Sequence, residues 1–322
     1  MISESEKYVG RFAPSPTGRM HLGNVFSALL SWLSAKAVGG KWLLRIEDID
    51  PQRSKRQYAD LLMQDLEWLG LTWDESPVYQ SRRSEVYEYY LGVLREKGVL
   101  YPSYKTRAER LAVSAPQDSN ANLNSNSNLN SNFDFNSVAS SRDGRLGGHS
   151  DVGLNVAAAM AVRVDDVTVS YTDGHYGVQR VSMSDDIGDF VVRRRDGAWA
   201  YQLCVTVDDA LMGVTEVVRG RDLLRSGAQQ IYLARLLGLR EMRYCHFPLL
   251  VNEAGQRLSK RDRSLDMGVL RERYSPRELV GVLACLAGIV PEVGGFSPEE
   301  LVPLFRWDDV PVDDIGGYGV LS

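Results

Sequence analysis

A proline-rich loop near the start of the chain carries residues that could bind a phosphate-bearing substrate. Residues 11–24 read Arg-Phe-Ala-Pro-Ser-Pro-Thr-Gly-Arg-Met-His-Leu-Gly-Asn, between a short apolar run and a stretch whose apolar residues recur at helical spacing. In an open parallel sheet, a strand–loop–helix junction presents backbone N–H groups and the positive end of the helix dipole to anions. The sequence therefore predicts an anion-binding site, with His21 as a donor and Gly23 leaving room for a flat ring.

Two further groups of polar residues lie far apart in the sequence. An acidic stretch, residues 47–50, follows the predicted strand 41–46, and Pro51 ends that strand before a predicted helix. At the carboxyl edge of a parallel sheet, such carboxylates could capture a substrate amine. The third group is the basic segment 256–262, Gln-Arg-Leu-Ser-Lys-Arg-Asp, which by itself is typical of a solvated surface loop.

The composition indicates a globular protein of two or three domains. The chain has 322 residues, of which 44% are hydrophobic, so it can bury a sizeable core. Its start lacks the features of a signal peptide, and no apolar run approaches membrane-spanning length, so we expect a cytoplasmic protein. A net charge of −5 argues against a globally basic nucleic-acid binder, although local clusters such as residues 193–195 could contact phosphates.

Taken together, the first loop and the basic segment resemble the paired "HIGH" and "KMSKS" signatures of class I aminoacyl-tRNA synthetases. They occur here as His-Leu-Gly-Asn and Arg-Leu-Ser-Lys-Arg. The runs Arg-Phe-Ala-Pro-Ser-Pro-Thr-Gly and Arg-Ile-Glu-Asp-Ile-Asp narrow the resemblance to the glutamyl and glutaminyl branch. It implies an α/β fold, in which a Rossmann-type catalytic domain carries an inserted small α/β domain, like those that bind the tRNA acceptor end, and a short C-terminal helical domain.

The same resemblance implies ATP-dependent activation of glutamate and assigns residues to it. His21 and Lys260 would be catalytic, by stabilising charge on the phosphates. The glutamate-binding residues that it implies are Arg11, Ala13, Ser15, Glu47, Tyr201 and Arg219. The ATP-binding residues that it implies are Pro14, His21, Gly23, Asn24, Leu258, Ser259, Lys260 and Arg261. Two arginines facing the substrate's side-chain carboxylate favour glutamate over glutamine.

The order of predicted elements suggests a nucleotide-binding fold interrupted once. Residues 1–100 would form the first half of the catalytic domain, and residues 186–255 the second half. Between them, residues 101–185 would form the inserted domain, including a flexible Asn- and Ser-rich segment, 114–149. Residues 256–322 would contain the lysine loop and a short helical domain, whose Ser-Pro-Arg-Glu and Ser-Pro-Glu-Glu runs are typical of helix starts.

One departure from the family concerns a metal. Many members hold zinc in the inserted domain through a Cys-x-Cys pair and a later Tyr-x-x-x-Cys run, ligands suited to a tetrahedral site. The corresponding positions here are Ser103, Lys105, Leu146 and Ser150. We therefore expect no structural zinc and no metal-binding residues. The family resemblance implies ATP as a substrate and Mg²⁺ as a cofactor.

The chain continues for only about sixty residues after the lysine loop, without the anticodon-reading domain typical of bacterial glutamyl-tRNA synthetases. This shortened form most resembles the branch that attaches glutamate to queuosine in the anticodon loop of tRNA(Asp). The expected partners are queuosine-containing tRNA(Asp), glutamate and ATP, and the expected state is a monomer without membrane contact. Two alternatives stay open, a truncated synthetase that charges tRNA(Glu) and a non-catalytic paralogue that binds a nucleotide or tRNA.

Overall fold

A parallel sheet at the centre of the molecule holds the first loop. The structure, a computed structural model, describes residues 7–104, 158–252, 255–256 and 265–316. The central sheet has three parallel strands in the order β1–β2–β3, and these strands are β1 (Val9–Phe12), β2 (Lys41–Ile46) and β3 (Val78–Tyr79). The bounds of β2 are those predicted for the strand before the acidic stretch.

A second sheet continues beyond β1. Its strands run in the order β7–β6–β10–β9, and they are β6 (Thr168–Asp173), β7 (Gly177–Ser182), β9 (Glu216–Gly220) and β10 (Arg243–Phe247). β10 pairs in parallel with both β9 and β6. The two sheets meet where the Thr215 N–H donates to the Val9 carbonyl at 2.8 Å. The carboxyl ends of β1, β2 and β9 therefore share one edge.

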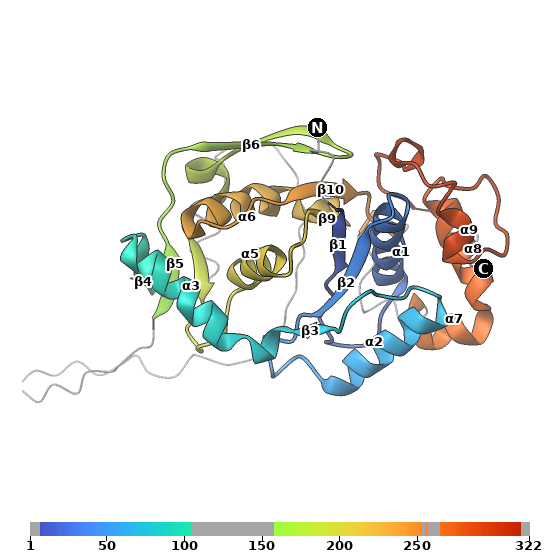
Figure 1. Cartoon of the computed structure of the whole chain (residues 1–322), viewed down its shortest axis with the longest axis horizontal. Helices are drawn as coiled ribbons and strands as arrows, with labels where there is room; N and C mark the ends of the chain where they lie inside the picture. The colour runs from blue at the N-terminus through green and yellow to red at the C-terminus, as the bar shows by residue number, and fades with distance from the viewer. Residues whose placement is uncertain (1–6, 105–157, 253–254, 257–264, 317–322) are drawn as a thin grey trace, which may run out of the picture.

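Helices cover both faces of these sheets (Figure 1). They are α1 (Leu22–Lys36), α2 (Arg56–Trp68), α3 (Ser84–Glu96), α5 (Tyr201–Leu211), α6 (Leu224–Leu237), α7 (Met267–Arg273), α8 (Pro276–Leu286) and α9 (Pro298–Leu301). α1 is largely buried between the central sheet and the C-terminal helices, whereas α5 and α6 pack in a separate apolar core with α3. The predicted strand–loop–helix order around residues 11–24 is confirmed.

The C-terminal helices begin as predicted. Ser275 and Ser297 are the N-cap residues of α8 and α9, each followed by proline at the first helical position. Each serine forms a capping box with the glutamate three residues later, which satisfies backbone N–H groups that a helix start otherwise leaves unpaired. Within the described ranges, no helix is long and apolar enough to cross a membrane.

A third sheet is small and antiparallel. It has the order β4–β5–β8, formed by β4 (Leu100–Ser103), β5 (Ala159–Val162) and β8 (Phe190–Arg193). Strand pairing crosses the domain boundary expected between residues 185 and 186, because β8 pairs with β5 and β10 pairs with β6. The division into domains stays a prediction. Because β6 pairs with β10, the hairpin of β6 and β7 belongs to the sheet that supports the site.

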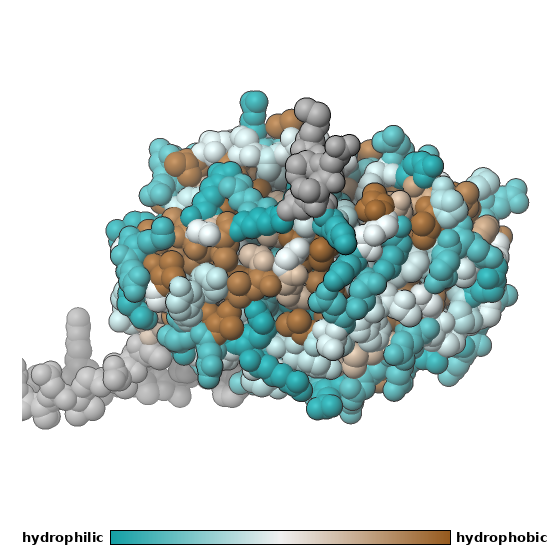
Figure 2. Space-filling view, in the orientation of Figure 1, coloured by the Kyte–Doolittle hydropathy of each residue, from teal (hydrophilic) through white to brown (hydrophobic). Residues whose placement is uncertain are grey.

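The hydropathy of the surface differs from one helix to another. On the face shown in Figure 2, hydrophobic residues gather around α5, whereas the residues over α2 are mainly hydrophilic. This pattern fits α2, whose buried residues are confined to one side: Ala59, Leu62, Asp65 and Leu66. The face shown in Figure 2 therefore has both polar and apolar areas.

Candidate active site

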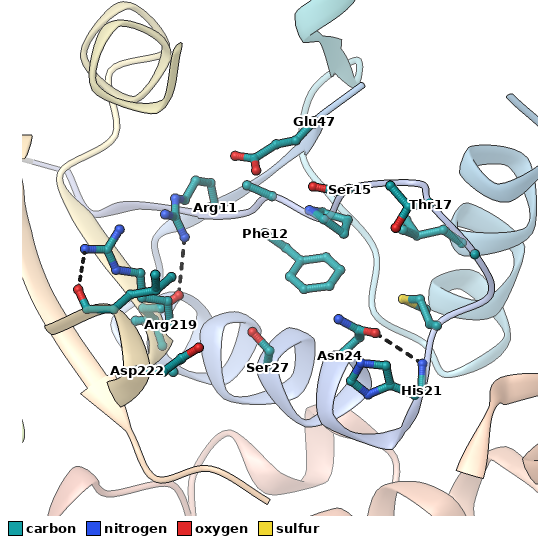
Figure 3. Close-up of a pocket in the computed structure, with 18 of the residues that line it drawn as sticks. Arg11, Phe12, Ser15, Thr17, His21, Asn24, Ser27, Glu47, Arg219 and Asp222 are labelled. Atoms are coloured by element: carbon teal, nitrogen blue, oxygen red, sulfur yellow. Dashed lines mark hydrogen bonds between the residues drawn. The ribbon is translucent and has the colours of Figure 1, made fainter. Parts of the chain in front are cut away.

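A cavity of about 490 Å³ opens at the shared carboxyl edge of β1, β2 and β9, beside the start of α1. Figure 3 shows its two ends. The guanidinium groups of Arg11 and Arg219 lie at one end near Glu47, and His21 and Asn24 lie at the other. The cavity therefore offers positive charge and a carboxylate at one end and a helix start at the other.

The charged end rests on a buried network. Arg45 lies on β2 and is fully buried, with its terminal nitrogens on Asp209 of α5 at 2.5 Å and on Glu47 at 3.2 Å. Asp209 also accepts a hydrogen bond from Nε of Arg11 at 3.3 Å. Buried charges require such pairing, because removing an unpaired ion from water is costly. Arg45 and Asp209 thus fix the positions of Arg11 and Glu47 relative to each other.

Two carboxylates of this network respond differently to burial. Burial raises the pKa of Glu47 above its ordinary value, although Arg45 and Arg11 oppose the shift. For Asp209, burial acts in the same direction, but the charges of Arg45 and Arg11 outweigh it and lower the pKa. Asp209 is therefore a stable anion between two arginines, whereas Glu47 gains from any further cation in the cavity.

Arg219 on β9 is held by a second network. Its Nε lies 3.0 Å from Nε2 of His246, its Nη1 donates to Gln230 at 2.8 Å, and its Nη2 donates to the carbonyl of Leu223 at 3.2 Å. These contacts use three of the five N–H groups of the guanidinium. Arg219 is therefore fixed in place and still has donors for a ligand.

The tautomer of His246 follows from its two partners. Arginine can only donate, so Nε2 of His246 accepts, and the proton sits on Nδ1, 2.6 Å from Oδ2 of Asp173. Burial lowers the pKa of His246, and the Arg219 charge adds to the effect, while the hydrogen bond to Asp173 opposes it. A neutral imidazole thus orients Arg219, and Asp173 on β6 orients the imidazole.

The other end of the cavity is the start of α1. His21 is the N-cap residue of α1 and is 8% exposed, and its backbone N–H donates to Oδ1 of Asn24 at 3.2 Å. A Cβ at Gly23 would lie 3.2 Å from the His21 ring, so the glycine gives this ring its space. Gly23 borders a smaller neighbouring cavity of about 70 Å³ with Phe247 and Leu250.

Predicted residues of the lysine segment, Leu258, Ser259, Lys260 and Arg261, lie outside the described residues. The residues that follow the segment lie beside the site. Asp266 forms an isolated β-bridge with His21, and the Met267 N–H donates to the carbonyl of Met20 at 2.8 Å. Asp266 also caps α7 through the N–H groups of Gly268 and Val269. The chain after the lysine segment is thereby anchored at the His21 end of the cavity.

The remaining predicted residues lie on the cavity wall. Ala13, Pro14 and Ser15 belong to the loop after β1, and the Pro14 carbonyl accepts from the Glu47 N–H at 3.0 Å. Tyr201 is the first residue of α5. All described residues predicted for glutamate binding therefore line one cavity.

The structure describes one of the four positions that correspond to the zinc ligands of the family. Ser103 lies on β4, while Lys105, Leu146 and Ser150 lie outside the described residues. Within the described ranges, no group of three or more His, Cys, Asp or Glu side chains could hold a metal ion. The expectation that the chain has no structural zinc stays a prediction.

Sequence analysis missed the residues that support the site. Arg45, Asp209 and His246 contact the binding residues, and Asp173 contacts His246. All four are buried. A signal was available for Arg45, since a charged residue inside the apolar strand 41–46 must find a partner. The partner itself comes from a helix more than 160 positions away.

The comparisons with known proteins agree with this site. Residues 7–295 match the family described as tRNA synthetases class I (E and Q), catalytic domain. The chain belongs to this family. As a class I tRNA synthetase it is a ligase, and the family implies ATP, an amino acid and tRNA as its substrates.

Relatives and solved structures support the assignment over most of the chain. A glutamyl-Q tRNA(Asp) synthetase of Nitratidesulfovibrio vulgaris is 40% identical over 312 residues, covering 94% of this chain and 93% of the relative. One of Symbiobacterium thermophilum is 41% identical and covers 95% and 94%. A glutamate tRNA ligase of Elizabethkingia meningosepticum, solved with its amino acid, superposes with a TM-score of 0.74 at 25% identity, over 97% of this chain and 67% of that one. The predicted fold class is confirmed.

Proposed function

We propose that this class I synthetase activates glutamate with ATP and transfers it to queuosine in the anticodon loop of tRNA(Asp). The single observation that carries the activation step is one cavity with two anchored arginines and a carboxylate at one end and the His21 helix start at the other. The acceptor rests on the names of the similar proteins, glutamyl-Q tRNA(Asp) synthetases. We propose a cytoplasmic location for this reaction.

In the proposed mode, glutamate occupies the charged end of the cavity. Arg219 and Arg11 pair with its side-chain carboxylate, Glu47 accepts its ammonium group, and Tyr201 closes the wall. Ser15 and the amides near Ala13 hold the end that reacts. Glu47 supports this assignment, because burial disfavours its charge until a cation such as the ammonium group arrives.

ATP occupies the other end, with its α-phosphorus toward the glutamate carboxylate. A carboxylate oxygen forms the bond to the α-phosphorus, the bond to the bridging oxygen breaks, and pyrophosphate leaves with the electron pair. His21 and the helix start near Gly23 stabilise charge on the phosphates, with Asn24 and Pro14 shaping the wall. We assign Lys260, with Leu258, Ser259 and Arg261, to the same phosphates, supported by the anchoring of Asp266 beside His21.

Magnesium would enter with the nucleotide. Because the described residues offer no cluster of three ligating side chains, the ion would be held mainly by ATP phosphates and water, an arrangement common for Mg²⁺. The chemistry it would supply is charge neutralisation on the phosphates. We propose that the enzyme is a monomer.

The function is tested with radiolabelled glutamate, ATP and two purified tRNAs, queuosine-containing tRNA(Asp) and tRNA(Glu). Label is expected on tRNA(Asp), and the same tRNA without queuosine is the matched control that should stay unlabelled. Label on tRNA(Glu) alone would instead support a truncated glutamyl-tRNA synthetase. Glutamate-dependent ATP–pyrophosphate exchange without tRNA is also expected, and its absence would favour a non-catalytic binding protein.

The raised pKa of Glu47 predicts a pH dependence. The ammonium group binds the ionised carboxylate, so the KM for glutamate should rise as the pH falls and Glu47 takes up a proton. Because burial raises this pKa, the rise begins at a higher pH than for an ordinary glutamate, and pyrophosphate exchange between about pH 5 and 8 measures it. Glu47→Gln should bind weakly at every pH, whereas a flat wild-type profile would contradict the assignment.

A further inference from the structure

A third arginine, Arg19, lines the active-site cavity in addition to Arg11 and Arg219. It belongs to the loop before α1, two residues ahead of His21. Figure 3 shows Thr17 and His21, which flank it along this loop, on the side of the cavity away from Arg219. Among the described residues that line the cavity, Arg19 is therefore the one arginine outside the end that we assign to glutamate.

Arg19 is anchored through one of its nitrogens. Its Nη2 donates to Oδ1 of Asp65 on α2 at 3.2 Å, and its side chain is 29% exposed. Its Nε is buried and has no hydrogen-bond partner among the described residues. A guanidinium has five N–H groups, and a buried donor without a partner lowers stability. Arg19 is thus oriented by α2 and still has donors for a ligand.

The ion-pair cluster around Arg19 carries more positive than negative charge. Asp65 is fully buried, and its Oδ1 also accepts from Nη1 of Arg271 on α7 at 2.9 Å. The guanidinium of Arg271 lies 5.0 Å from the ring centroid of Trp68, and this arginine does not line the cavity. One carboxylate therefore faces two guanidinium groups, which leaves one positive charge in excess within these three side chains. An anion in the cavity would balance that charge.

The surroundings of His21 differ in polarity between its two cavities. The smaller cavity, which His21 shares with Gly23, has apolar walls from Phe247 and Leu250. The larger cavity supplies the charge of Arg19. In ATP the phosphates carry the charge and the base is flat and uncharged, so charge matching places phosphates at Arg19. Because the α-phosphate must adjoin the glutamate carboxylate, the β- and γ-phosphates are the ones that extend to this side.

We propose that Arg19 binds the β- and γ-phosphates of ATP and the pyrophosphate that leaves during activation. This inference rests on the proposed function, because it requires ATP in the cavity. When the bond from the α-phosphorus to the bridging oxygen breaks, pyrophosphate keeps the electron pair and gains negative charge. A fixed guanidinium stabilises that charge and pairs with two phosphate oxygens at once. Asp65 is the positioning residue that holds Arg19.

The test compares two arginines that share Asp65. Arg19→Gln removes the charge from the cavity, and Arg271→Gln is the matched control, because Arg271 donates to the same carboxylate but does not line the cavity. Calorimetric titration of the whole chain with ATP and Mg²⁺, and separately with AMP, measures nucleotide binding. AMP lacks the two outer phosphates, so the difference between the two nucleotides reports on them.

The expected effect is selective for ATP. In Arg19→Gln the Kd for ATP should rise about 10-fold to 100-fold, the usual loss of a hydrogen bond to a charged group, while the Kd for AMP stays within about twofold. In Arg271→Gln both constants should stay within about twofold. In pyrophosphate exchange, Arg19→Gln should raise the KM for ATP and for pyrophosphate and leave the KM for glutamate within about twofold.

A second variant guards against misfolding. Arg19→Lys keeps a positive charge beside Asp65 and should bind ATP more tightly than Arg19→Gln, although less tightly than the wild type, because an ammonium group cannot pair with two oxygens as a guanidinium does. Urea unfolding of each variant shows whether it remains folded.

The outcomes separate this assignment from the proposed function. Unchanged ATP affinity in Arg19→Gln and Arg19→Lys, or equal losses for ATP and AMP, would overturn the role of Arg19 and leave glutamate activation standing. Similar losses in Arg19→Gln and Arg271→Gln would overturn it too, because the cluster would then act only on the fold. A wild-type protein that binds ATP without glutamate-dependent exchange would overturn the proposed function, and the comparison of ATP with AMP would still decide whether Arg19 binds phosphates.

Discussion

Replacing Arg45 by leucine is expected to lower the free energy of unfolding by about 3–5 kcal/mol, the usual effect of removing one partner from a buried ion pair. The substitution leaves two carboxylates, Asp209 and Glu47, without the guanidinium that now lies within 3.2 Å of both. Asp209 is 1% exposed, so water cannot replace the lost partner. Urea unfolding of the wild type and the variant measures the difference.

A second arginine-to-leucine substitution provides the control. Arg235 on α6 pairs with Glu241 at 2.8 Å, and both side chains are nearly half exposed. Because exposed ion pairs contribute little, Arg235→Leu should change the unfolding free energy by at most about 1 kcal/mol. An Arg45→Leu protein as stable as the Arg235→Leu protein would show that the buried network does not stabilise the fold.

Replacing Arg219 by glutamine is expected to reduce the efficiency of glutamate-dependent pyrophosphate exchange by about 10²-fold to 10³-fold. The charge that would face the substrate's side-chain carboxylate is lost, while His246 and Gln230 lose the donor they now share. The loss should appear mainly in the KM for glutamate, because the arginine lies at the end of the cavity remote from His21. Exchange kinetics at varied glutamate and saturating ATP measure it.

Arg221→Gln is the matched control for this prediction. Arg221 lies two residues beyond Arg219, is 42% exposed, and pairs with Asp314 outside the cavity. Its substitution should alter exchange by no more than about twofold. Similar losses in the two variants, or a selective loss in the KM for ATP in Arg219→Gln, would argue against our placement of glutamate.

The parts of the fold that follow from local sequence could be predicted. The strand 41–46 has an apolar run closed by acidic residues and Pro51, and its observed bounds are the same. The helix starts at Ser275 and Ser297 could be predicted because a capping box is defined by four consecutive residues. By contrast, the parallel pairing of β6 with β10 joins residues 71 positions apart, Asp173 and Tyr244, and no local pattern specifies that contact.

The candidate site likewise has parts that local sequence could predict and parts that depend on contacts between distant residues. Glu47 and His21 could be placed together because one follows a strand and the other precedes a helix at one sheet edge, and the family resemblance added Arg11. The partners that orient these residues could not be predicted. A buried salt bridge or a histidine tautomer depends on which side chains come into contact in the folded chain. His246 shows this most clearly, since its role is defined by a strand from what looked like a separate domain.

The pairing of β4 with β5 has a consequence for length variation in this part of the chain. Ser103 faces Ala159 in an antiparallel ladder, so the 55 intervening positions start and finish at adjacent strands. The entropic penalty of closing a flexible connection grows only logarithmically, by about 0.6 kcal/mol for each doubling. A change in the number of residues between Ser103 and Ala159 should therefore alter the free energy of folding only slightly while the sheet keeps its register.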